Sequence, residues 1–538
     1  MPVVADLVLR NGTIWRGRGA GRCTALAVRG ERVLATGDEE AIAALVGPGT
    51  RVIDLAGRLA VPGLNDAHLH LLPLGLAMLA VDVRPEVVPT LDALLGRIAA
   101  AAADRPPGSW IVARGYDHFA LDVRRHPTAD ELERAAPGRP CVLVRACGHI
   151  WVASRSALAA AGLDDTAESP PGGLVEKRDG RLTGLLAEHA RAPVERVMPA
   201  PSDAELVDAI ERAGRHCLER GVTSVMDAAV GIRAGMREIE AYREARRAGR
   251  LPVRTHLCLL GEAQGIVEEC WRAGLVTGAG DAMLGIGPVK IFTDGSAGGR
   301  TAAMSEPYLG EPGGTGILCL PDDELRALVA SYHARGYRLA PHAIGDRAID
   351  RVLDAYEGAL EGRPAHARRH RIEHCGFVRD DQLSRMRALG IEPSPQPVFV
   401  RDFGDLYRAV LGEARAARAY PLRTWLERGF HPAVGTDAPV CAVDPLPNLH
   451  AMLTRRTRSG TVLGPEQRVE VEDALYCYTE AGARLEGSEA VKGRLLPDML
   501  ADIAVFDRDL LAVEPDALLE ARCDLAIRGG AVVFERRE

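Results

Sequence analysis

The stretch "VPGLNDAHLH", residues 61–70, places His68 and His70 two positions apart, shortly after a Val-Pro-Gly turn. If Asp66 to His70 forms the end of a strand, its two-residue period points both imidazoles to one face, where they can bind one cation. Histidines in a strand can also form hydrogen bonds inside a core. The two histidines alone therefore do not distinguish a metal site from a buried polar pair. The rest of the sequence is needed to decide.

The overall composition predicts a multidomain protein of a reducing compartment. At 538 residues the chain exceeds the size at which one hydrophobic core stops growing. It carries 66 Lys and Arg against 74 Asp and Glu, a net charge of −8, without the basic block that binds a phosphate backbone, so we expect no nucleic-acid partner. Its eleven cysteines are scattered without a C-x-x-C motif, which argues against a disulfide framework.

Neither the start of the chain nor its apolar runs indicate a membrane or secretory protein. The opening "MPVVADLVLRNG" lacks the basic and apolar regions of a secretory signal. The longest apolar run, residues 71–81, is too short to cross a bilayer. We therefore expect a cytoplasmic protein without membrane contacts.

The middle of the chain predicts an α/β barrel. From about residue 203, amphipathic helical stretches such as "DAELVDAIERAGRHCLERG" alternate with short apolar strands. Repeated β-then-α units of this length indicate a parallel sheet, and eight of them indicate a TIM-type (β/α)8 barrel. The eight expected strands lie within residues 59–66, 222–228, 253–260, 287–295, 337–346, 369–377, 391–399 and 431–439.

Both ends of the chain read as short alternating strands with Asn-Gly and Gly-Gly turns, so they could pair into one small β-sandwich. We assign residues 1–58 and 490–538 to this sandwich, and residues 59–85 and 200–489 to the barrel. The connection over residues 86–199 is too long for a plain loop and predicts an inserted subdomain over the barrel mouth.

Polar side chains stand at the carboxyl ends of the expected barrel strands, which converge on one mouth. Imidazoles together with an anion suit a borderline cation such as zinc, and a coordination position left for water would make the site catalytic. Lys290 is unusual, because an isolated ammonium inside a barrel costs several kcal/mol unless it pairs with an acid such as Asp294. The predicted metal ligands are His68, His70, Lys290, His342, His374 and Asp437.

Each of these residues also has a structural interpretation. His342 could cap the following helix, His374 could be a buried histidine bonded to a carbonyl, and Asp437 could be a turn or helix-cap residue. One shared site explains all of these residues at successive strand ends. We consider it far less expected that each residue has a separate structural role.

The motifs resemble those of a known family. The fragments "VPGLNDAHLH", "VKIFTDGSAGGRTA", "PHAIGDRAID", "RHRIEH", "PSPQPVF" and "GTDAPVCAVDPL" are similar to successive motifs of the amidohydrolase superfamily. They resemble in particular its YtcJ-like branch (amidohydrolase family 3), which includes the N-substituted formamide deformylases. The similarity covers nearly the whole chain, including the segment around His149 in the insertion.

The resemblance implies a metal centre of one or two ions. His68, His70 and Asp437 would hold one ion, and His342 and His374 would hold or approach a second. The expected ion is Zn²⁺, with iron and manganese left open, and a one-metal site stays an alternative.

The resemblance also implies roles for individual side chains. Lys290 would be N-carboxylated and bridge two ions, and burial supports this because it favours the neutral amine that reacts with carbon dioxide. Asp437 would take a proton from the attacking water and return it to the leaving nitrogen, while His374 or His149 would stabilise the developing oxyanion.

Four further residues are predicted substrate contacts. Arg300 could equally be a solvated loop residue, and an aromatic residue such as Trp151 is more often part of a core. Glu188 stands where the branch often has Glu, and no role is assigned to it. The four predicted contacts are Asp227, Arg300, Gln396 and Trp151.

Together these features predict a metal-dependent hydrolase of a non-peptide C–N bond, in an amide or an N-formyl or N-acyl amine, acting on a small molecule. The alternatives are a cyclic amide or amidine hydrolase or deaminase of the same superfamily, an ester or phosphoester hydrolase, and a non-catalytic scaffold with the barrel fold. A scaffold would have lost metal residues, and here none is missing. The substrate and the oligomeric state stay open, with a homodimer among the assemblies allowed.

Overall fold

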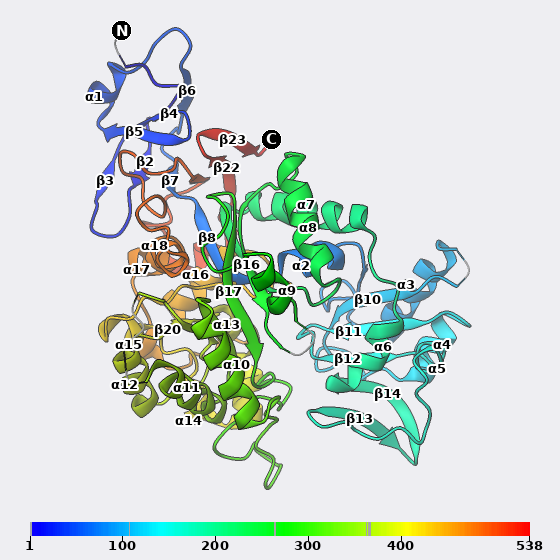
Figure 1. Ribbon diagram of the computed structural model, residues 1–538. Helices are drawn as coiled ribbons and strands as arrows, with labels where there is room; N and C mark the ends of the chain where they lie inside the picture. The colour runs from blue at the N-terminus through cyan, green and yellow to red at the C-terminus, as the bar shows by residue number, and fades with distance from the viewer. Residues whose placement is uncertain (1–2, 107, 263–264, 362, 364–366, 538) are drawn as a thin grey trace.

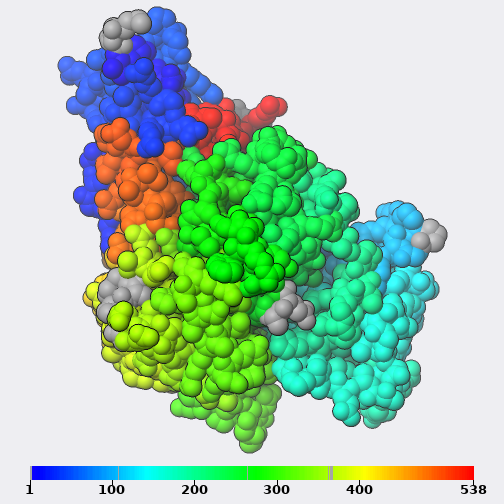
Figure 2. Space-filling view, viewed as in Figure 1, coloured from blue at the N-terminus to red at the C-terminus, as the bar shows by residue number. Residues whose placement is uncertain are grey.

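The computed structural model describes residues 3–106, 108–262, 265–361, 363 and 367–537 (Figure 1). Its strands form four sheets, which make up a central barrel, an inserted α/β unit and two sheets at the chain ends. Figure 2 shows the insertion, in cyan, as a lobe at the side of the barrel, and the end sheets, in blue and red, as a second lobe. Among the described residues, no helix has both the length and the apolar character that crossing a membrane requires.

The barrel consists of parallel strands in the order β20-β19-β18-β17-β16-β15-β8, which confirms the predicted TIM-type fold. All seven are mostly buried, because helices cover the outside and side chains fill the inside. The strands are β8 (Leu64–Leu69), β15 (Val222–Val230), β16 (Arg254–Leu260), β17 (Leu284–Phe292), β18 (Leu339–Ala343), β19 (Arg371–His374) and β20 (Glu392–Ser394).

The eighth expected strand, within residues 431–439, is not a regular strand but still closes the barrel. The backbone N–H of Ala67 in β8 donates to the carbonyl of Val434 at 3.1 Å. On the other side, the N–H of Gly435 donates to the carbonyl of Pro395, next to β20, at 3.2 Å. An irregular segment therefore joins the first and last strands of the barrel.

The first expected strand, residues 59–66, is in fact two strands in two different sheets. β7 (Leu59–Pro62) belongs to a sheet at the chain ends, and the barrel strand β8 begins only at Leu64. Gly63 lies between them, where an added Cβ would come within 2.1 Å of Thr223 Oγ1. A side chain at this position would collide with β15, so only glycine lets the chain pass directly from one sheet into the barrel.

The two chain ends share a sheet, as predicted. β7 pairs in parallel with β2 and antiparallel with β21, so the six strands lie in the order β23-β22-β21-β7-β2-β3, and a four-stranded sheet β5-β4-β1-β6 packs against them. The N-terminal strands are β1 (Leu7–Arg10), β2 (Thr13–Trp15), β3 (Arg22–Cys23), β4 (Ala25–Arg29), β5 (Arg32–Gly37) and β6 (Arg51–Asp54), and the C-terminal strands are β21 (Ile503–Phe506), β22 (Cys523–Arg528) and β23 (Ala531–Glu535).

The insertion is a six-stranded mixed sheet with helices on it, in the order β13-β14-β12-β11-β10-β9. Its strands are β9 (Val81–Asp82), β10 (Ile111–Tyr116), β11 (Cys141–Arg145), β12 (Ile150–Ala153), β13 (Gly173–Arg178) and β14 (Arg181–Glu188). Its helices are α3 (Leu91–Ala103), α4 (Ala129–Ala135), α5 (Arg155–Ala160), the 3₁₀ turn η1 (His189–Arg191) and α6 (Ala192–Val197).

The barrel helices follow from amphipathic periodicity and clear start signals. In α7 (Asp203–Leu218), Ser202 and Glu205 form a capping box at the first turn, and the apolar face, including Leu206 and Ile210, is buried. The remaining α-helices of the described chain are α1 (Glu39–Ala43), which lies between β5 and β6, and α2 (Leu71–Ala77), α8 (Met236–Arg247), α9 (Val267–Arg272), α10 (Asp322–Ala334), α11 (Asp346–Leu360), α12 (Asp380–Leu389), α13 (Val398–Leu411), α14 (Glu413–Ala417), α15 (Leu422–Glu427), α16 (Pro445–Thr454), α17 (Val471–Cys477) and α18 (Glu480–Glu486).

Candidate metal centre and active site

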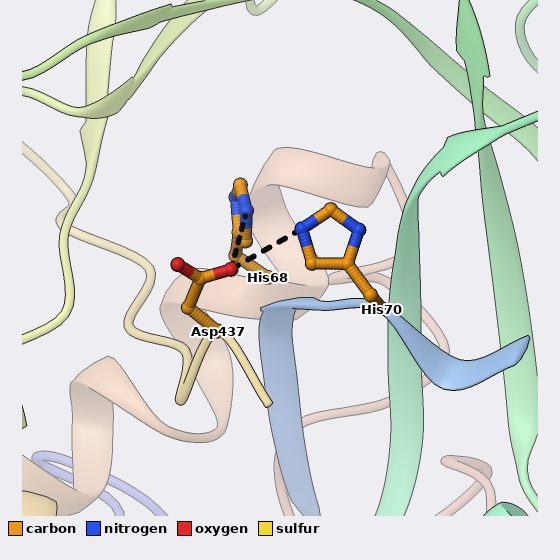
Figure 3. Close-up of side chains that lie close together, drawn as sticks. All are labelled: His68, His70 and Asp437. Carbon is orange, nitrogen blue, oxygen red and sulfur yellow. Dashed lines mark ion pairs between the residues drawn. The ribbon is translucent and has the colours of Figure 1, made fainter. Parts of the chain in front are cut away.

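Three of the predicted metal ligands meet at the carboxyl ends of the barrel strands (Figure 3). His68 and His70 come from β8 and the residue after it, and their Nε2 atoms lie 3.4 and 3.3 Å from Oδ1 of Asp437. This Oδ1 is buried and has no hydrogen-bond partner in the described part of the chain. A buried acceptor without a donor normally has another partner. Two imidazole nitrogens and this carboxylate oxygen fit a divalent cation.

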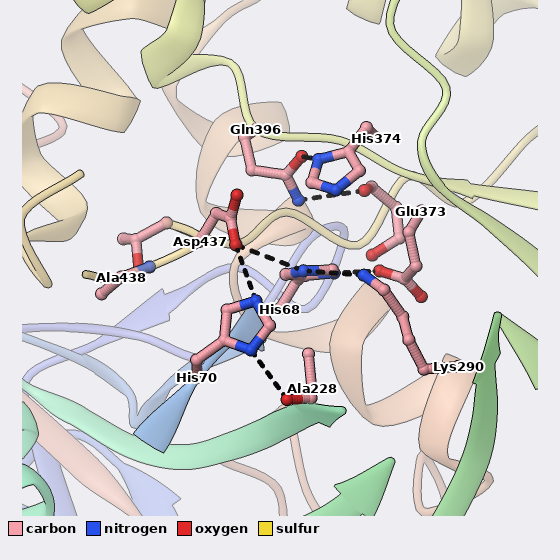
Figure 4. A network of polar contacts seen from close by, with 12 residues as sticks. His68, His70, Ala228, Lys290, Glu373, His374, Gln396, Asp437 and Ala438 are labelled. Carbon is pink, nitrogen blue, oxygen red and sulfur yellow. Dashed lines mark hydrogen bonds and ion pairs between the residues drawn. The ribbon is translucent and has the colours of Figure 1, made fainter. Parts of the chain in front are cut away.

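Five histidines lie at or near this site, and each is held through its Nδ1 atom by an oxygen. Figure 4 shows three of them, His68, His70 and His374. Carbonyl, amide and carboxylate oxygens accept hydrogen bonds, so each ring carries a proton on Nδ1. A neutral ring then keeps a lone pair on Nε2, the form that binds a metal. The pairs are His70 with the Ala228 carbonyl at 2.7 Å, His342 with Asp294 at 2.9 Å, His374 with Gln396 at 2.5 Å, His149 with Glu188 at 2.8 Å, and His68 with Glu373.

Burial keeps three of these rings neutral. It lowers the pKa of His70, and it holds the pKa values of His342 and His374 well below the usual range. The ring centroids of His342 and His374 are 4.4 Å apart, and those of His68 and His374 are 4.9 Å apart. The structure therefore keeps His70, His342 and His374 in the neutral state that coordination requires.

Lys290 is wholly buried in β17, with Nζ 3.5 Å from Nε2 of His68 and 4.9 Å from the ring centroid of Phe292. Burial lowers its pKa. The expected alternative partner, Asp294, does not pair with it. Asp294 instead accepts hydrogen bonds from Nδ1 of His342 and from three backbone amides. Among the described residues, none forms an ion pair with the Lys290 ammonium.

Glu373, which the sequence analysis did not identify, lies behind the metal ligands. It is completely buried between His68 and Arg371 and contacts both side chains. Burial alone would raise the pKa of Glu373, but Arg371 and His68 outweigh it and keep the carboxylate ionised. The signal in the sequence was an acid inside the apolar strand "RHRIEHCGF", since a buried charge needs a partner.

The insertion contributes His149 to the site. Its ring centroid lies 6.2 Å from that of His342, and its Nδ1 is held by Glu188, for which the sequence had suggested no role. Burial acts to lower the pKa of His149, but the charge of Glu188 outweighs it and raises this pKa. His149 therefore holds a second proton more readily than His70, His342 and His374, whose pKa values are lowered.

Three residues of the site have strained backbone conformations. Glu188, His374 and Asp437 have φ angles of 50°, 66° and 57°, in the left-handed region that non-glycine residues rarely adopt. Such conformations persist where the surroundings hold them in place, and they cluster at functional sites.

Two of the predicted substrate contacts, Asp227 and Gln396, are bonded to other parts of the site. The carboxylate of Asp227 accepts hydrogen bonds from the N–H groups of Leu71 and Leu72 at 2.8 and 3.2 Å and from the hydroxyl of Tyr242. It therefore holds the first turn of α2, directly behind His70. Gln396 is fully buried, and its amide oxygen orients His374.

The other two predicted contacts also have protein partners. Arg300 forms an ion pair with Glu311 in an exposed loop, 2.5 Å from Nη1 to Oε1. Trp151 is 1% exposed in the core of the insertion, and its Nε1 donates to the carbonyl of Gly148 at 3.1 Å. Both side chains are engaged by the protein, and their contact with substrate stays a prediction.

Comparison with known proteins places the chain in a family. A model described as "Amidohydrolase family" matches residues 51–534. The chain is 28% identical to YtcJ of Bacillus subtilis (strain 168), over 91% of each chain. It is also 28% identical to N-substituted formamide deformylase of Arthrobacter pascens, over 100% of this chain and 99% of that protein.

A solved structure agrees with this. An uncharacterized metal-dependent hydrolase from Pyrococcus horikoshii superposes with a TM-score of 0.77 at 29% identity, covering 95% of this chain and 99% of that chain. The resemblance seen in the motifs is confirmed, and the chain belongs to the amidohydrolase family.

Proposed function

We propose that this protein is a metal-dependent hydrolase that cleaves a non-peptide C–N bond in a small amide or an N-formyl or N-acyl amine. The observation that carries the proposal is the unpartnered Oδ1 of Asp437, which faces Nε2 of both His68 and His70 in a buried site. Family membership and the similarity to N-substituted formamide deformylase support the bond type.

His68, His70 and Asp437 would hold one divalent ion, with zinc as the expected identity. His342 and His374, both neutral and anchored through Nδ1, would hold or approach a second. When bound, such an ion lowers the pKa of a coordinated water toward neutrality and polarises a substrate carbonyl.

Asp437 would act as the proton shuttle. Burial alone would raise the pKa of its carboxyl, but His68 and His70 outweigh burial and hold this pKa well below its usual range, so the group is ionised at neutral pH. It would accept a proton from the attacking water and return it to the leaving nitrogen as the C–N bond breaks.

The two histidines predicted to stabilise the oxyanion differ in their protonation. His374 is neutral with its proton on Nδ1, so its Nε2 has no hydrogen to donate, and ligation suits it better. His149 has a raised pKa and can present an Nε2–H toward the substrate carbonyl oxygen. We therefore assign the oxyanion contact to His149, held in position by Glu188.

Lys290 would be N-carboxylated and act as an anionic bridge. A buried neutral amine can attack carbon dioxide, forming an N–C bond and releasing one proton to solvent. The product carries a negative charge in place of an ammonium, which suits a position beside His68 and two divalent ions.

A metal analysis and a substrate panel, measured on the same preparation, test this function. We expect one to two transition-metal ions per chain, hydrolysis of N-formyl or N-acyl amines in preference to carbamates and cyclic amides, and loss of activity on chelation that added metal restores. His68→Gln should lose metal and activity, and His216→Gln on the outer helix α7 is the matched control. Full activity in protein without metal, or metal-loaded protein that hydrolyses none of these amides, would overturn the proposal.

A further inference from the structure

Three arginines gather where the insertion meets the barrel. Arg114 lies in β10 and Arg191 ends η1, both in the insertion, whereas Arg233 lies in the loop after barrel strand β15. The guanidinium carbons of Arg191 and Arg233 are 5.4 and 5.6 Å from the ring centroid of Trp151. Two separate parts of the fold thus direct positive charge toward one aromatic side chain.

This arginine cluster borders the active site through Gly148, the residue before His149. Arg191 donates a hydrogen bond from Nη1 to the Gly148 carbonyl. A Cβ placed on Gly148 would lie 3.5 Å from Nη2 of Arg114. Two of the three guanidinium groups therefore contact the residue next to the proposed oxyanion donor.

The cluster has more positive charge than nearby acids can balance. Nε of Arg114 is buried and has no hydrogen-bond partner among the described residues. Arg191 donates to the backbone carbonyls of Gly148 and Glu188, not to a carboxylate. Arg233 has one acid partner, Glu195, at 3.8 Å.

Two other acids near the cluster are already engaged. Glu188 holds His149, and Glu238 accepts hydrogen bonds from backbone amides, among them that of Arg233. Burial lowers the pKa of Arg114 to about 10, with Arg233 and Arg191 adding to the shift and Asp437 opposing it. The three arginines and Asp437 therefore share one electrostatic environment, in which the guanidinium groups repel one another.

Such an arrangement is unfavourable unless an anion binds there, and it is notable in a chain whose net charge is −8. Since Arg191 is bonded to carbonyls and Arg233 is near Glu195, the side chain least occupied is Arg114. The planar guanidinium of Arg114 matches a carboxylate through two parallel N–H bonds.

We propose that Arg114, together with Arg191 and Arg233, binds a carboxylate on the substrate, so that the enzyme prefers anionic amides such as N-formyl or N-acyl amino acids over neutral ones. This inference rests on the proposed function and narrows its substrate class. The arginines bind and orient the substrate, while His149 and Asp437 contact the reacting bond.

A matched substrate pair tests the proposal. N-formyl-L-phenylalanine and N-formyl-2-phenylethylamine differ only in the carboxylate. A hydrogen bond to a charged group contributes about 1.5–3 kcal/mol, so we expect wild-type kcat/KM to favour the acid by about 10- to 100-fold. Arg114→Met should remove most of this preference and change kcat/KM for the neutral amide by less than about 3-fold.

Two further variants complete the kinetic test. Arg233→Met should weaken the preference in the same direction, which guards against a folding defect specific to Arg114→Met. Arg134→Met, on an exposed face of insertion helix α4, should leave the preference unchanged. Equal kcat/KM for the two amides in wild type, or an equal loss for both in Arg114→Met, would overturn carboxylate recognition and leave the amidase function standing.

A binding measurement decides the case in which neither amide is hydrolysed. We expect calorimetric titration with 3-phenylpropanoate to show binding that weakens in Arg114→Met and at high salt, whereas 3-phenylpropanamide binds much more weakly to wild type. If the two compounds bind alike, the anion site is wrong. If only the acid binds but no amide is cleaved, the anion site stands and the proposed function fails.

Discussion

Replacing Asp437 with Asn removes one proton acceptor and preserves the size of the side chain. The residue is 6% exposed, and its Oδ1 faces Nε2 of His68 and His70 without a hydrogen bond from the described part of the chain. The amide oxygen of Asn can take the place of Oδ1 beside both imidazoles. We therefore expect the variant to fold and to retain bound metal.

We expect the substitution of Asp437 by Asn to lower kcat. Loss of a general acid–base group reduces a rate by about 10²- to 10⁴-fold, which corresponds to roughly 3–5 kcal/mol of transition-state stabilisation. KM should change little, because Asp437 is proposed to act on the water and the leaving nitrogen and not on the distant parts of the substrate. Since no hydrogen bond to Oδ1 is lost, the free energy of unfolding should change by less than about 1 kcal/mol.

The assay measures kcat, KM and metal content for wild type, Asp437→Asn and Asp444→Asn. Asp444 caps α16 by accepting a hydrogen bond from the Leu446 N–H at 3.0 Å, and Asn caps helices equally well, so this variant should retain wild-type turnover. If Asp437→Asn keeps more than about a tenth of wild-type kcat with full metal content, the reasoning is refuted and proton transfer belongs to another group.

Three further predictions concern the supporting structure. Gln396→Ala removes the oxygen that holds His374 and should lower metal affinity or kcat/KM by about 10- to 100-fold, whereas an unchanged metal titration would show that packing alone orients the ring. Deleting residues 500–538 removes β21 to β23 and should unfold the N-terminal strands that pair with them, as measured by hydrogen exchange; a protected N-terminal sheet in the shortened chain would contradict this. The folded-state pKa of Glu188, about 2, lies below its ordinary value of 4.5, so its stabilising effect is complete above about pH 4.5 and is lost as the pH falls toward 2; Glu188→Gln should flatten acid unfolding in this window, and an unchanged acid profile would argue against the ion pair with His149.

The meeting of distant ligands was predictable from the sequence. Strands of a parallel barrel end at one mouth, so polar residues at successive strand ends had to lie near one another. Asp437 meets His68 and His70 although it is far from them in the chain. The period of two in a strand correctly placed the two histidines on one face.

The partners of these residues were not predictable, because periodicity does not specify which donor a buried acid meets. Asp227 and Glu373 are both acids at the ends of apolar strands. Only the folded chain shows that one binds the amides of α2 and the other holds His68. The same limit explains Trp151, whose apolar surroundings were compatible with a pocket as well as with a core.

The sequence pattern also did not reveal which sheet each strand joins. Residues 59–69, "LAVPGLNDAHL", fit one long strand as well as two short strands in different sheets. The division at Gly63 depends on the approach of Thr223, a residue from another strand. The sequence of residues 431–439 resembles that of a buried strand, but their backbone is irregular in the structure.

The shared sheet of the chain ends has a consequence for synthesis in the cell. β7 needs β21 as its antiparallel neighbour, and β21 is made only after the whole barrel has been synthesised. β7 therefore leaves the ribosome with an unpaired edge, which stays unpaired while the barrel is synthesised. During this interval the edge of β7 can pair with strands of other chains. We therefore expect the nascent chain to depend on chaperone binding near this edge until β21 pairs with β7.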